Sequence, residues 1–388
     1  MTKQIVLLTG ISGFIGLHIA KQLLDQGFHV RGSIRNLKKA QSITNTLEKA
    51  SANVSELSFV ELDLTSDNGW DNAAEGCDYV MHVASPYAAA EPKHEDEMIK
   101  PAVDGSLRAL RAAKKAGVKR VVLTSSTMTM MATMKSGTIR PNDWADTNAK
   151  DIGTYAKSKT LAEQAAWQFM EEQNSAMELV TVNPGGVFGP ALGDDISGQS
   201  MSMIDQMLRG KVPMLANVAI PMIDVRDVAN AHVQAMTHPK AAGQRIIASR
   251  PEAIHITEIA KILKDYGYKV IDAIVEHFDT QNTKNPVSIA SRKEMDAIFL
   301  ETAPEKGADA TKVLDFVIDK VLKESNIVSH PKSFSFVPGP SNYISAMADT
   351  LATGFNIFSG GWAASPTASE LEIVTINWLL KLFKFPTK

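Results

Sequence analysis

Three glycines near the amino terminus constrain the fold of this chain more than any other feature. They lie in the run Thr9-Gly10-Ile11-Ser12-Gly13-Phe14-Ile15-Gly16, after the apolar segment 5–9 and before an amphipathic segment that stops at Gly27. In such a context the first glycine permits a tight turn, the second lets the backbone approach a pyrophosphate, and the third lets a helix pack closely on the strand. The helix N-terminus supplies N–H donors and a positive dipole to the phosphates. We therefore predict a strand-turn-helix unit that binds a dinucleotide through Gly10, Gly13, Phe14, Ile15 and Gly16.

Short β-branched runs alternate with helix-length amphipathic segments from Ile5 to about Ala248. This alternation is typical of a parallel sheet with helices on both faces, and several runs are continuously apolar, as strands buried on both faces are. The sequence thus predicts an α/β fold with a doubly wound, Rossmann-type parallel sheet and a small substrate lobe. The expected strands are 5–9, 29–34, 57–61, 79–83, 121–125, 179–183 and 245–248.

The regular alternation ends after about Val270, where a polar stretch at 279–285 leads into a mostly helical-looking region. We place a boundary near residue 275. Residues 1–275 are expected to form the nucleotide-binding domain with its substrate lobe, and residues 276–388 a mostly helical extension.

Residues at the end of the second expected strand indicate which nicotinamide dinucleotide is preferred. Enzymes that prefer NAD usually place an acid there, which bonds the ribose 2′-hydroxyl. This chain has basic residues instead, including Arg35 and Lys39. A guanidinium at position 35 could hold a 2′-phosphate with two parallel hydrogen bonds, so NADPH is expected; the alternative is a solvated basic start to a helix. Asp63 and Leu64, after the third expected strand, are placed to meet the adenine edge.

Tyr155 and Lys159 form the candidate catalytic pair. They are four residues apart in the segment 154–173, which is expected to be helical, so they lie on one face a turn apart. A tyrosine ordinarily titrates near pH 10, and a nearby ammonium together with an oxidised nicotinamide would lower its pKa toward neutrality. Ser126 follows an expected strand at the edge of the sheet where ligands bind, and its hydroxyl can bond a substrate oxygen. The alternative for the lysine-rich helix is a solvated basic face.

The overall composition favours a small-molecule substrate. The 388 residues include 40 basic and 43 acidic side chains, a formal net charge of −3, so nothing global attracts nucleic acid or an anionic membrane. The single cysteine cannot form an internal disulfide, no run of 18 or more apolar residues occurs, and no signal region precedes the first strand. We expect a cytoplasmic protein that holds no metal.

Together these motifs resemble the extended short-chain dehydrogenase/reductases, and within them the branch of dihydroflavonol reductases, cinnamoyl-CoA reductases and bacterial or fungal aldehyde reductases. The similarity covers about residues 3–270. Besides the glycine motif, the matching pieces are His82-Val83-Ala84-Ser85-Pro86, Pro101-Ala102-Val103-Asp104-Gly105, Arg120-Val121-Val122-Leu123-Thr124-Ser125-Ser126, Tyr155 with Lys159, Asn183-Pro184, Gly189-Pro190 and Asp224-Val225-Arg226-Asp227-Val228-Ala229.

The resemblance implies a role for each residue of the catalytic set. Ser126 would position the substrate carbonyl, Tyr155 would donate the proton, and Lys159 would hold the nicotinamide ribose while lowering the tyrosine pKa. Matching positions imply that Val83, Ala84, Ser85 and Pro184 line the cofactor cleft. For His82 we favour a satisfied core histidine over an acid or base.

The resemblance also implies where the substrate lies. This branch builds its pocket from the segment after the catalytic serine, the loop after Asn183-Pro184 and the C-terminal part of the chain. The first of these, 127–135, is rich in methionine here, which suits either an apolar aldehyde or ketone or ordinary core packing.

Residues from about 285 to 388 resemble something else, the N-terminal part of pyridoxal-phosphate decarboxylases of the aromatic amino acid type. The matching pieces are Ser329-His330-Pro331, Phe336-Val337-Pro338-Gly339-Pro340, Asn356, Trp362-Ala363-Ala364-Ser365-Pro366, Glu370-Leu371-Glu372 and Trp378-Leu379. That family's Schiff-base lysine lies farther downstream than Lys388, so decarboxylation is not expected. The segment is either a natural fusion that covers the reductase lobe or a truncated, mis-joined appendage. Its apolar residues favour a homo-oligomer or poor solubility.

The function expected from these observations is the NADPH-dependent reduction of an aldehyde or ketone, in the manner of a dihydroflavonol 4-reductase. Two alternatives stay open. One is a nucleotide-sugar epimerase or dehydratase that uses the same three residues. The other is an inactive cofactor-binding fusion product, against which the retained Tyr155 and Lys159 argue.

Overall fold

The computed structural model describes residues 3–86, 92–173, 175–193, 198–208, 217–280 and 308–322, and the single residues 283, 291, 293, 294, 297, 376 and 380. Most of the predicted C-terminal extension therefore lies outside the described residues. The chain divides into two compact units, residues 1–207 with 212–257, and residues 208–211 with 258–388. All elements of the nucleotide-binding fold belong to the first unit.

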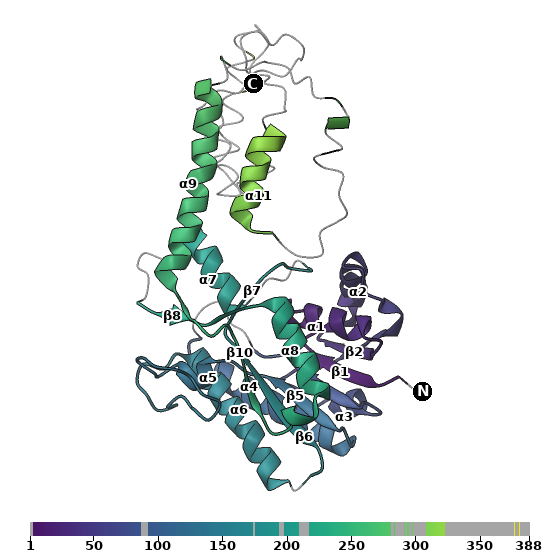
Figure 1. The fold of residues 1–388 in the computed structure, drawn as a ribbon. Coiled ribbons are helices and arrows are strands. Elements are labelled where there is room, and N and C mark those ends of the chain that lie inside the picture. The colour runs from purple at the N-terminus through teal and green to yellow at the C-terminus, as the bar shows by residue number, and fades with distance from the viewer. Residues whose placement is uncertain are drawn as a thin grey trace. The chain divides into compact units, whose positions relative to one another are not determined.

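A seven-stranded sheet forms the centre of this first unit (Figure 1). Its strand order is β10-β6-β5-β4-β1-β2-β3, and every pair of neighbours runs parallel. The prediction of a doubly wound parallel sheet is confirmed, with strand ends within one residue of those expected. The strands are β1 Ile5–Thr9, β2 His29–Ile34, β3 Leu57–Glu61, β4 Tyr79–His82, β5 Arg120–Thr124, β6 Glu178–Pro184 and β10 Arg245–Ala248.

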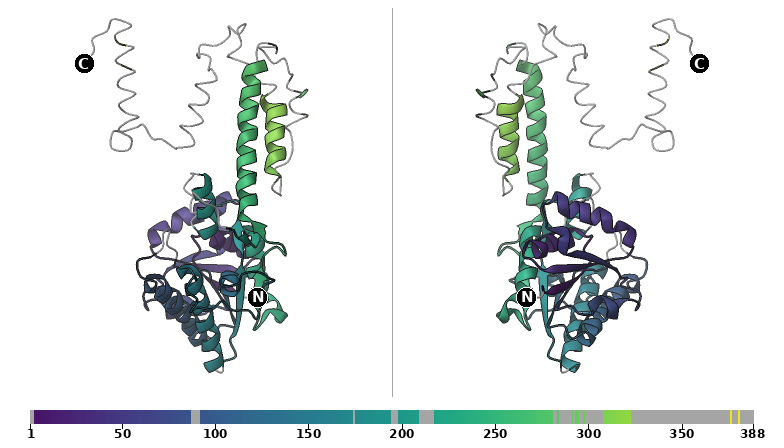
Figure 2. Two further views of the ribbon diagram at one scale, coloured as in Figure 1. Left: turned by 90° about the vertical axis from the view of Figure 1, so that its left-hand side faces the viewer. Right: turned by 90° about the vertical axis from the view of Figure 1, so that its right-hand side faces the viewer.

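Helices cover both faces of this sheet (Figure 2). The helices of one face are α1 Phe14–Asp25, α2 Ala40–Lys49 and α8 Val225–Thr237. Those of the other face are α3 Trp70–Ala74, α4 Asp96–Lys115 and α6 Thr154–Glu172. Short 3₁₀ turns connect some of these elements. The turn Leu37–Lys39 precedes α2, Val54–Glu56 precedes β3, and Pro239–Ala241 follows α8.

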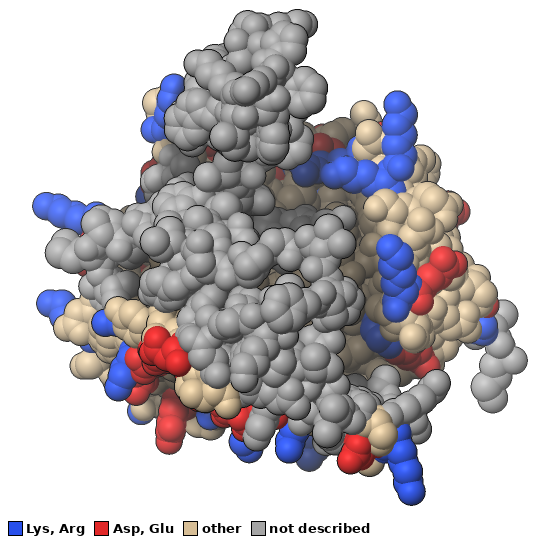
Figure 3. Space-filling model, turned by 90° about the horizontal axis from the view of Figure 1, so that it is seen from above, with Lys and Arg blue, Asp and Glu red and all other residues tan. Residues whose placement is uncertain are grey.

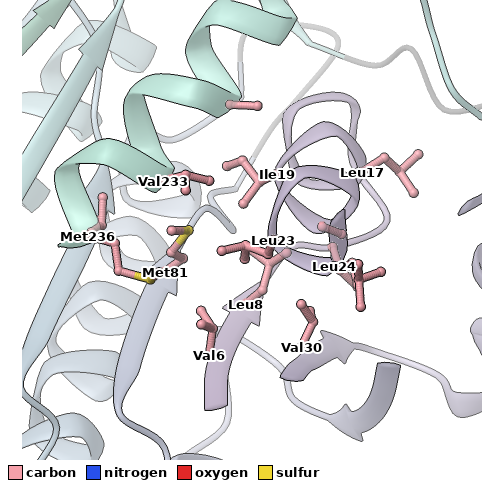
Figure 4. Close-up of a cluster of buried hydrophobic side chains, with 14 of the residues drawn as sticks. Val6, Leu8, Leu17, Ile19, Leu23, Leu24, Val30, Met81, Val233 and Met236 are labelled. Carbon is pink, nitrogen blue, oxygen red and sulfur yellow. The ribbon is translucent and has the colours of Figure 1, made fainter. Parts of the chain in front are cut away.

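Alternate residues of each strand supply the two cores, because side chains in a strand point to opposite faces. Val6 and Leu8 pack with α1 and α8, whereas Leu7 between them packs with α3 and α4. Figure 4 shows the first of these clusters, with Ile19 and Leu23 of α1 and with Val233 and Met236 of α8 beside the strands. The continuous apolar runs of the sequence thus reflect burial on both faces.

The first helix ends as its sequence predicts. Gly27 has a φ of 83°, in the left-handed region, and its N–H bonds to the carbonyl of Leu24 while the N–H of Phe28 bonds to that of Leu23. These two bonds form a Schellman motif, which satisfies carbonyls left over at the helix end. The short turn brings the chain directly into β2.

Smaller elements flank the sheet. They are α5 Met128–Met131, α7 Gln199–Leu208, the parallel pair β7 Gly186–Phe188 and β9 Met222–Asp224, and the antiparallel pair β8 Ala219–Ile220 and β11 Ile254–His255. The helix α9 Ile256–Thr280 passes unbroken through the boundary expected near 275. Beside it lies α11 Ala310–Phe316, where Asp315 pairs with Lys269 of α9 at 2.5 Å (Figures 1 and 2).

Basic and acidic side chains are interspersed over the described residues visible in Figure 3, in keeping with the near balance of the two in the sequence. Within the described part of the chain, none of the helices combines the length and apolarity needed to cross a bilayer.

Candidate active site

A cavity of about 590 Å³ opens at the carboxyl ends of the strands, where β1 and β4 lie side by side and the strand order reverses. This is the position at which open α/β sheets bind their ligands. Of the residues predicted to bind a cofactor or to catalyse, all but Lys39 line it: Gly10, Gly13, Phe14, Ile15, Gly16, Arg35, Asp63, Leu64, Val83, Ala84, Ser85, Ser126, Tyr155, Lys159 and Pro184.

The glycine turn has no room for a side chain at Gly10 or Gly16, whereas Gly13 has space beside it. A Cβ at Gly10 would lie 2.8 Å from the backbone nitrogen of Ala84, and one at Gly16 would lie 2.1 Å from the carbonyl oxygen of Gly10. At Gly13 the nearest atom would be 3.5 Å away, an ordinary contact. Gly13 caps α1 without a side-chain hydrogen bond, and the first turn carries no acid. The first N–H groups of α1 are therefore available to an anion in the cavity.

The Thr9 hydroxyl fixes the wall of the cavity opposite the glycine turn. Its oxygen accepts hydrogen bonds from the backbone N–H groups of Val83 and Ala84, both at 3.1 Å, and lies 2.9 Å from Nδ1 of His82. Because both lone pairs are used, the hydroxyl proton must point to Nδ1, which leaves the proton of the neutral ring on Nε2. His82 is thus a buried structural histidine, as the sequence analysis favoured.

The basic residues at the end of β2 take separate places. Arg35 is exposed and lines the cavity, and the buried Ser33 lines it too. Arg31 points elsewhere and donates to the carbonyls of Ala73 and Glu75. Lys39 is exposed on the 3₁₀ turn and is not among the lining residues, because the chain turns away from the sheet after Arg35. Cofactor binding by Lys39 therefore stays a prediction from the sequence.

The loop after β3 carries Asp63 and Leu64 to the same end of the cavity. One carboxylate oxygen of Asp63 accepts from the backbone and the hydroxyl of Thr65, at 2.7 and 2.6 Å. These bonds lower the pKa of Asp63, with the Thr65 hydroxyl as the larger cause. Arg108 of α4 donates to the carbonyl of Leu64 at 2.7 Å and pairs with the Asp67 carboxylate, which holds the loop against α4.

Ser126, Tyr155 and Lys159 meet at the other end. The strand β5 carries Ser126 just past its carboxyl end, and α6 brings Tyr155 and Lys159 to the cavity one turn apart. The hydroxyl of Ser126 is near enough to that of Tyr155 to lower the tyrosine pKa. The Lys159 ammonium donates to the carbonyl of Thr124 at 3.3 Å, and this side chain is almost fully buried.

Burial dominates the titration of these groups. It raises the pKa of Tyr155 above its usual value, against the lowering effect of the Ser126 hydrogen bond. It also lowers the pKa of Lys159 to about 8, although the negative charge of Glu163 opposes this shift. For Tyr155, removal of the hydroxyl from water outweighs the neighbouring donor. The lowering expected from the sequence includes the charge of an oxidised nicotinamide and stays a prediction.

Several lining residues carried no signal that sequence reasoning used. Trp70, Ser200 and Met201 line the cavity. Trp70 is the first residue of the short helix α3, and the other two lie in the first turn of α7, a helix that no periodic pattern predicted. The loop after Asn183-Pro184 does reach the cavity, through Gly185 and Val187. The methionine-rich segment 127–135 does not line it; Met130 is buried in the fold.

A glycine turn at the switch point of a parallel sheet, followed by a tyrosine and lysine on one helix face, defines the class of nicotinamide-dinucleotide enzymes with a short-chain dehydrogenase fold. The chain belongs to the NAD dependent epimerase/dehydratase family, whose model matches residues 6–248. The resemblance stated from the sequence is confirmed. Residues 293–388 match a second model, that of the pyridoxal-dependent decarboxylase conserved domain, and almost all of them lie outside the described residues.

Several of the similar proteins are reductases. A cinnamoyl-CoA reductase of Medicago truncatula is 32% identical over 68% of this chain and 80% of its own length. A bifunctional dihydroflavonol 4-reductase/flavanone 4-reductase of Malus domestica is 31% identical over 75% of this chain and 84% of its own length. The crystal structure of the yeast methylglyoxal/isovaleraldehyde reductase Gre2 complexed with NADPH is 31% identical, with a TM-score of 0.56 over 63% of this chain and 78% of that one.

Proposed function

We propose that this protein is an NADPH-dependent reductase that converts an aldehyde or ketone into the alcohol. The observation that carries the proposal is the single cavity that joins an uncapped helix N-terminus and Arg35 at one end to Ser126, Tyr155 and Lys159 at the other. The similar proteins that bind NADPH or reduce carbonyl compounds, Gre2 and the plant reductases, support this assignment.

The cavity suits NADPH along its length. The N–H groups at the start of α1 would donate hydrogen bonds to the pyrophosphate. Because Gly13 has no side chain, the phosphates could approach the backbone there. Arg35 would hold the 2′-phosphate, and Asp63 and Leu64 would border the adenine. Val83, Ala84, Ser85 and Pro184 would border the nicotinamide half, with Lys159 on its ribose.

NADPH, when bound, supplies the hydride that goes to the carbonyl carbon. The protein's own residues then manage the oxygen. The Ser126 hydroxyl donates a hydrogen bond that fixes the carbonyl oxygen, and Tyr155 transfers its proton to that oxygen as negative charge develops. The raised pKa of Tyr155 keeps this hydroxyl protonated at neutral pH, which a proton donor requires. Lys159, next to Tyr155 on α6, stabilises the tyrosinate that is left.

We also propose that residues 1–275 form the reductase domain with its substrate lobe, and residues 276–388 an extension. All cavity-lining residues lie between Thr9 and Met201. This supports a self-contained cofactor site within the first domain.

NADPH oxidation by the purified protein, followed across a panel of aldehydes, ketones and nucleotide sugars, tests the function. Steady oxidation with a carbonyl compound is the expected result. Conversion of a nucleotide sugar without net NADPH consumption would replace the proposal with an epimerase.

Tyr155→Phe should reduce turnover by about a hundredfold or more, the size expected when a positioned acid is removed, while the NADPH dissociation constant stays nearly unchanged. Tyr79→Phe, which alters a tyrosine of β4 outside the cavity lining, is the matched control. Normal turnover by Tyr155→Phe would exclude this residue as the proton donor.

A further inference from the structure

A buried carboxylate lies directly behind the proposed catalytic residues. Glu163 is on α6, one turn after Lys159 and two turns after Tyr155, so all three share one side of the helix. Its side chain is fully buried, with 0% exposure. Neither the proposed reaction nor the cofactor site uses it.

Donors from several elements surround this carboxylate. Ser125 at the end of β5 donates at 2.5 Å, Asn183 of β6 at 2.8 Å, and Arg245 of β10 at 2.7 Å. Trp167 of α6 donates at 3.4 Å, and the hydroxyls of Thr129 and Thr181 lie within 2.9 Å. One side chain thus links α6 to β5, α5, β6 and β10.

Two of the groups around Glu163 also contact the backbone of Ser126. The Asn183 amide that donates to Glu163 also lies 3.3 Å from the carbonyl oxygen of Ser126, and the Thr129 hydroxyl lies 2.9 Å from it. The rotation of α6 and the position of the strand end that carries Ser126 are therefore set by one group. A shift of about 1 Å in such a site can cost about a hundredfold in rate.

Arg245 neutralises the carboxylate and is itself fully engaged. Its guanidinium also donates to the carbonyls of Pro141 and Asp143 at 2.5 and 2.7 Å, and stacks 3.6 Å from the ring centre of Trp144. Burial opposes ionisation of Glu163, but the hydrogen bond and charge of Arg245, with Ser125 and Thr181, keep its pKa below the usual value. The pair is therefore charged at neutral pH.

The negative charge acts on Lys159. Burial pulls the Lys159 pKa down to about 8, and Glu163 is the group that resists this shift. The other titratable groups near Lys159 are Tyr155 on the same helix, His82 of β4, and His232 of α8, which contacts Thr124 next to the ammonium. Both histidines are neutral at pH 7 because burial lowers their pKa values to about 3 and about 4. Among the described residues, Glu163 is therefore the negative charge that acts on Lys159, and Arg245 is its counter-ion.

We propose that Glu163, neutralised on its other side by Arg245, is a positioning residue that holds Lys159 in its charged form and fixes the strand end that carries Ser126. The catalytic part of this inference rests on the proposed reductase function. Its electrostatic part concerns the chain alone and can be measured without substrate.

The test compares Glu163→Gln with Glu172→Gln, which removes an exposed carboxylate from the same helix. Trace labelling with acetic anhydride from pH 6 to 10, quantified by mass spectrometry of the Lys159 peptide, gives the titration midpoint of that amine. Because the neighbouring negative charge is lost, the midpoint in Glu163→Gln should fall by about one pH unit. Glu172→Gln should match the wild type.

Activity supplies the second readout. The kcat/KM for NADPH-dependent reduction should decline at a lower alkaline pH in Glu163→Gln than in the wild type, and the difference in pH should equal the shift of the labelling midpoint. In addition, kcat at pH 7 should fall about tenfold or more. The NADPH dissociation constant at pH 6.5, where Lys159 stays charged in both proteins, should change little. Glu163→Asp keeps the negative charge on a shorter side chain. Its labelling midpoint should be close to that of the wild type, whereas its kcat should stay low.

Loss of one member of a buried pair can destabilise the fold, so thermal unfolding is measured alongside. Should Glu163→Gln fail to fold, the double variant Glu163→Gln with Arg245→Met removes both charges and is labelled in its place. A smaller downward shift is then expected, because the more distant positive charge of Arg245 is lost as well. An unchanged Lys159 midpoint in the folded variant overturns the inference. If the midpoint shifts but the protein reduces no carbonyl compound, the electrostatic interaction between Glu163 and Lys159 is supported and the proposed reductase function is rejected.

Discussion

The imidazole of His82 is neutral in the fold because burial, and to a lesser extent the charge of Lys159, lowers its pKa to about 3. An unfolded histidine titrates near 6.5, so between these values the unfolded chain binds one more proton than the folded one. Stability is therefore highest above pH 6.5 and falls as the pH drops, by up to about 1.4 kcal/mol per pH unit for this residue. His232, with a pKa lowered by burial to about 4, adds a similar contribution.

His82→Asn tests this residue directly. The asparagine oxygen can take the place of Nδ1 as acceptor for the Thr9 hydroxyl, so the contact is kept while the titration is lost. Urea unfolding between pH 4.5 and 7.5 should show lower stability at pH 7.5 but a shallower loss toward acid, by about 1.4 kcal/mol per pH unit at most. An equally steep loss would mean that His82 does not contribute to acid unfolding.

Arg35 and Lys39 offer a matched pair of basic residues for the cofactor preference. Arg35 lines the cavity and Lys39, four positions on, is exposed outside it. Arg35→Ala should weaken NADPH by about tenfold or more, the size of a lost charge-assisted hydrogen bond, and NADH much less. Lys39→Ala should leave both dissociation constants near those of the wild type. Equal losses of NADPH and NADH affinity in Arg35→Ala would contradict a 2′-phosphate contact.

At the scale of elements, the glycine turn separates folding from binding. Gly16→Ala places a Cβ 2.1 Å from the Gly10 carbonyl oxygen, so α1 must move away from β1, and both stability and NADPH affinity should fall. At Gly13 a Cβ meets no fold atom closer than 3.5 Å, so Gly13→Ala should unfold near the wild-type temperature and still bind NADPH poorly. Differential scanning calorimetry and NADPH titration of the two variants give the comparison. Unimpaired NADPH binding by Gly13→Ala would place the pyrophosphate elsewhere.

The elements themselves were predictable where local sequence decides them. The seven strands of the large sheet are short runs rich in β-branched and apolar residues, several of them continuously apolar, and α1 is bounded by the glycine turn and Gly27. Their positions therefore follow from the sequence pattern. Three of the residues around the cavity were not predictable in this way. Trp70, Ser200 and Met201 reach it only because α3 and α7 are placed by tertiary packing, and neither helix has a pattern long enough to be recognised.

The pKa of Tyr155 shows a related limit of reasoning from sequence. The spacing of Tyr155 and Lys159 correctly places them one helical turn apart, but it carries no information on how deeply the hydroxyl is buried. In the fold, desolvation raises the tyrosine pKa instead of lowering it. Residue spacing predicts neighbours along an element, whereas the dielectric around them depends on the packing of the whole domain.

For the molecule as a whole, the cavity and the C-terminal segment can be separated experimentally. Because every cavity-lining residue lies between Thr9 and Met201, a chain cut after Thr280 should bind NADPH with an unchanged dissociation constant. The Michaelis constant of the carbonyl substrate should also stay the same if the segment is an appendage, and rise if it covers the substrate. Isothermal titration and steady-state kinetics of the two chain lengths distinguish these cases. A clear loss of NADPH affinity would contradict a self-contained cofactor site.

The link from Glu163 to Arg245 spans 82 residues of sequence, and this has a consequence for synthesis on the ribosome. When translation has passed Met201, every residue that lines the cavity has been made, but β10 has not. Until that strand emerges, the nascent chain must keep the carboxylate of α6 in water or protonated, since burying it uncompensated would be strongly unfavourable. The addition of the last strand of the sheet is therefore the event that allows α6 to dock fully, and with it the catalytic end of the site, whereas the nucleotide end can be complete much earlier.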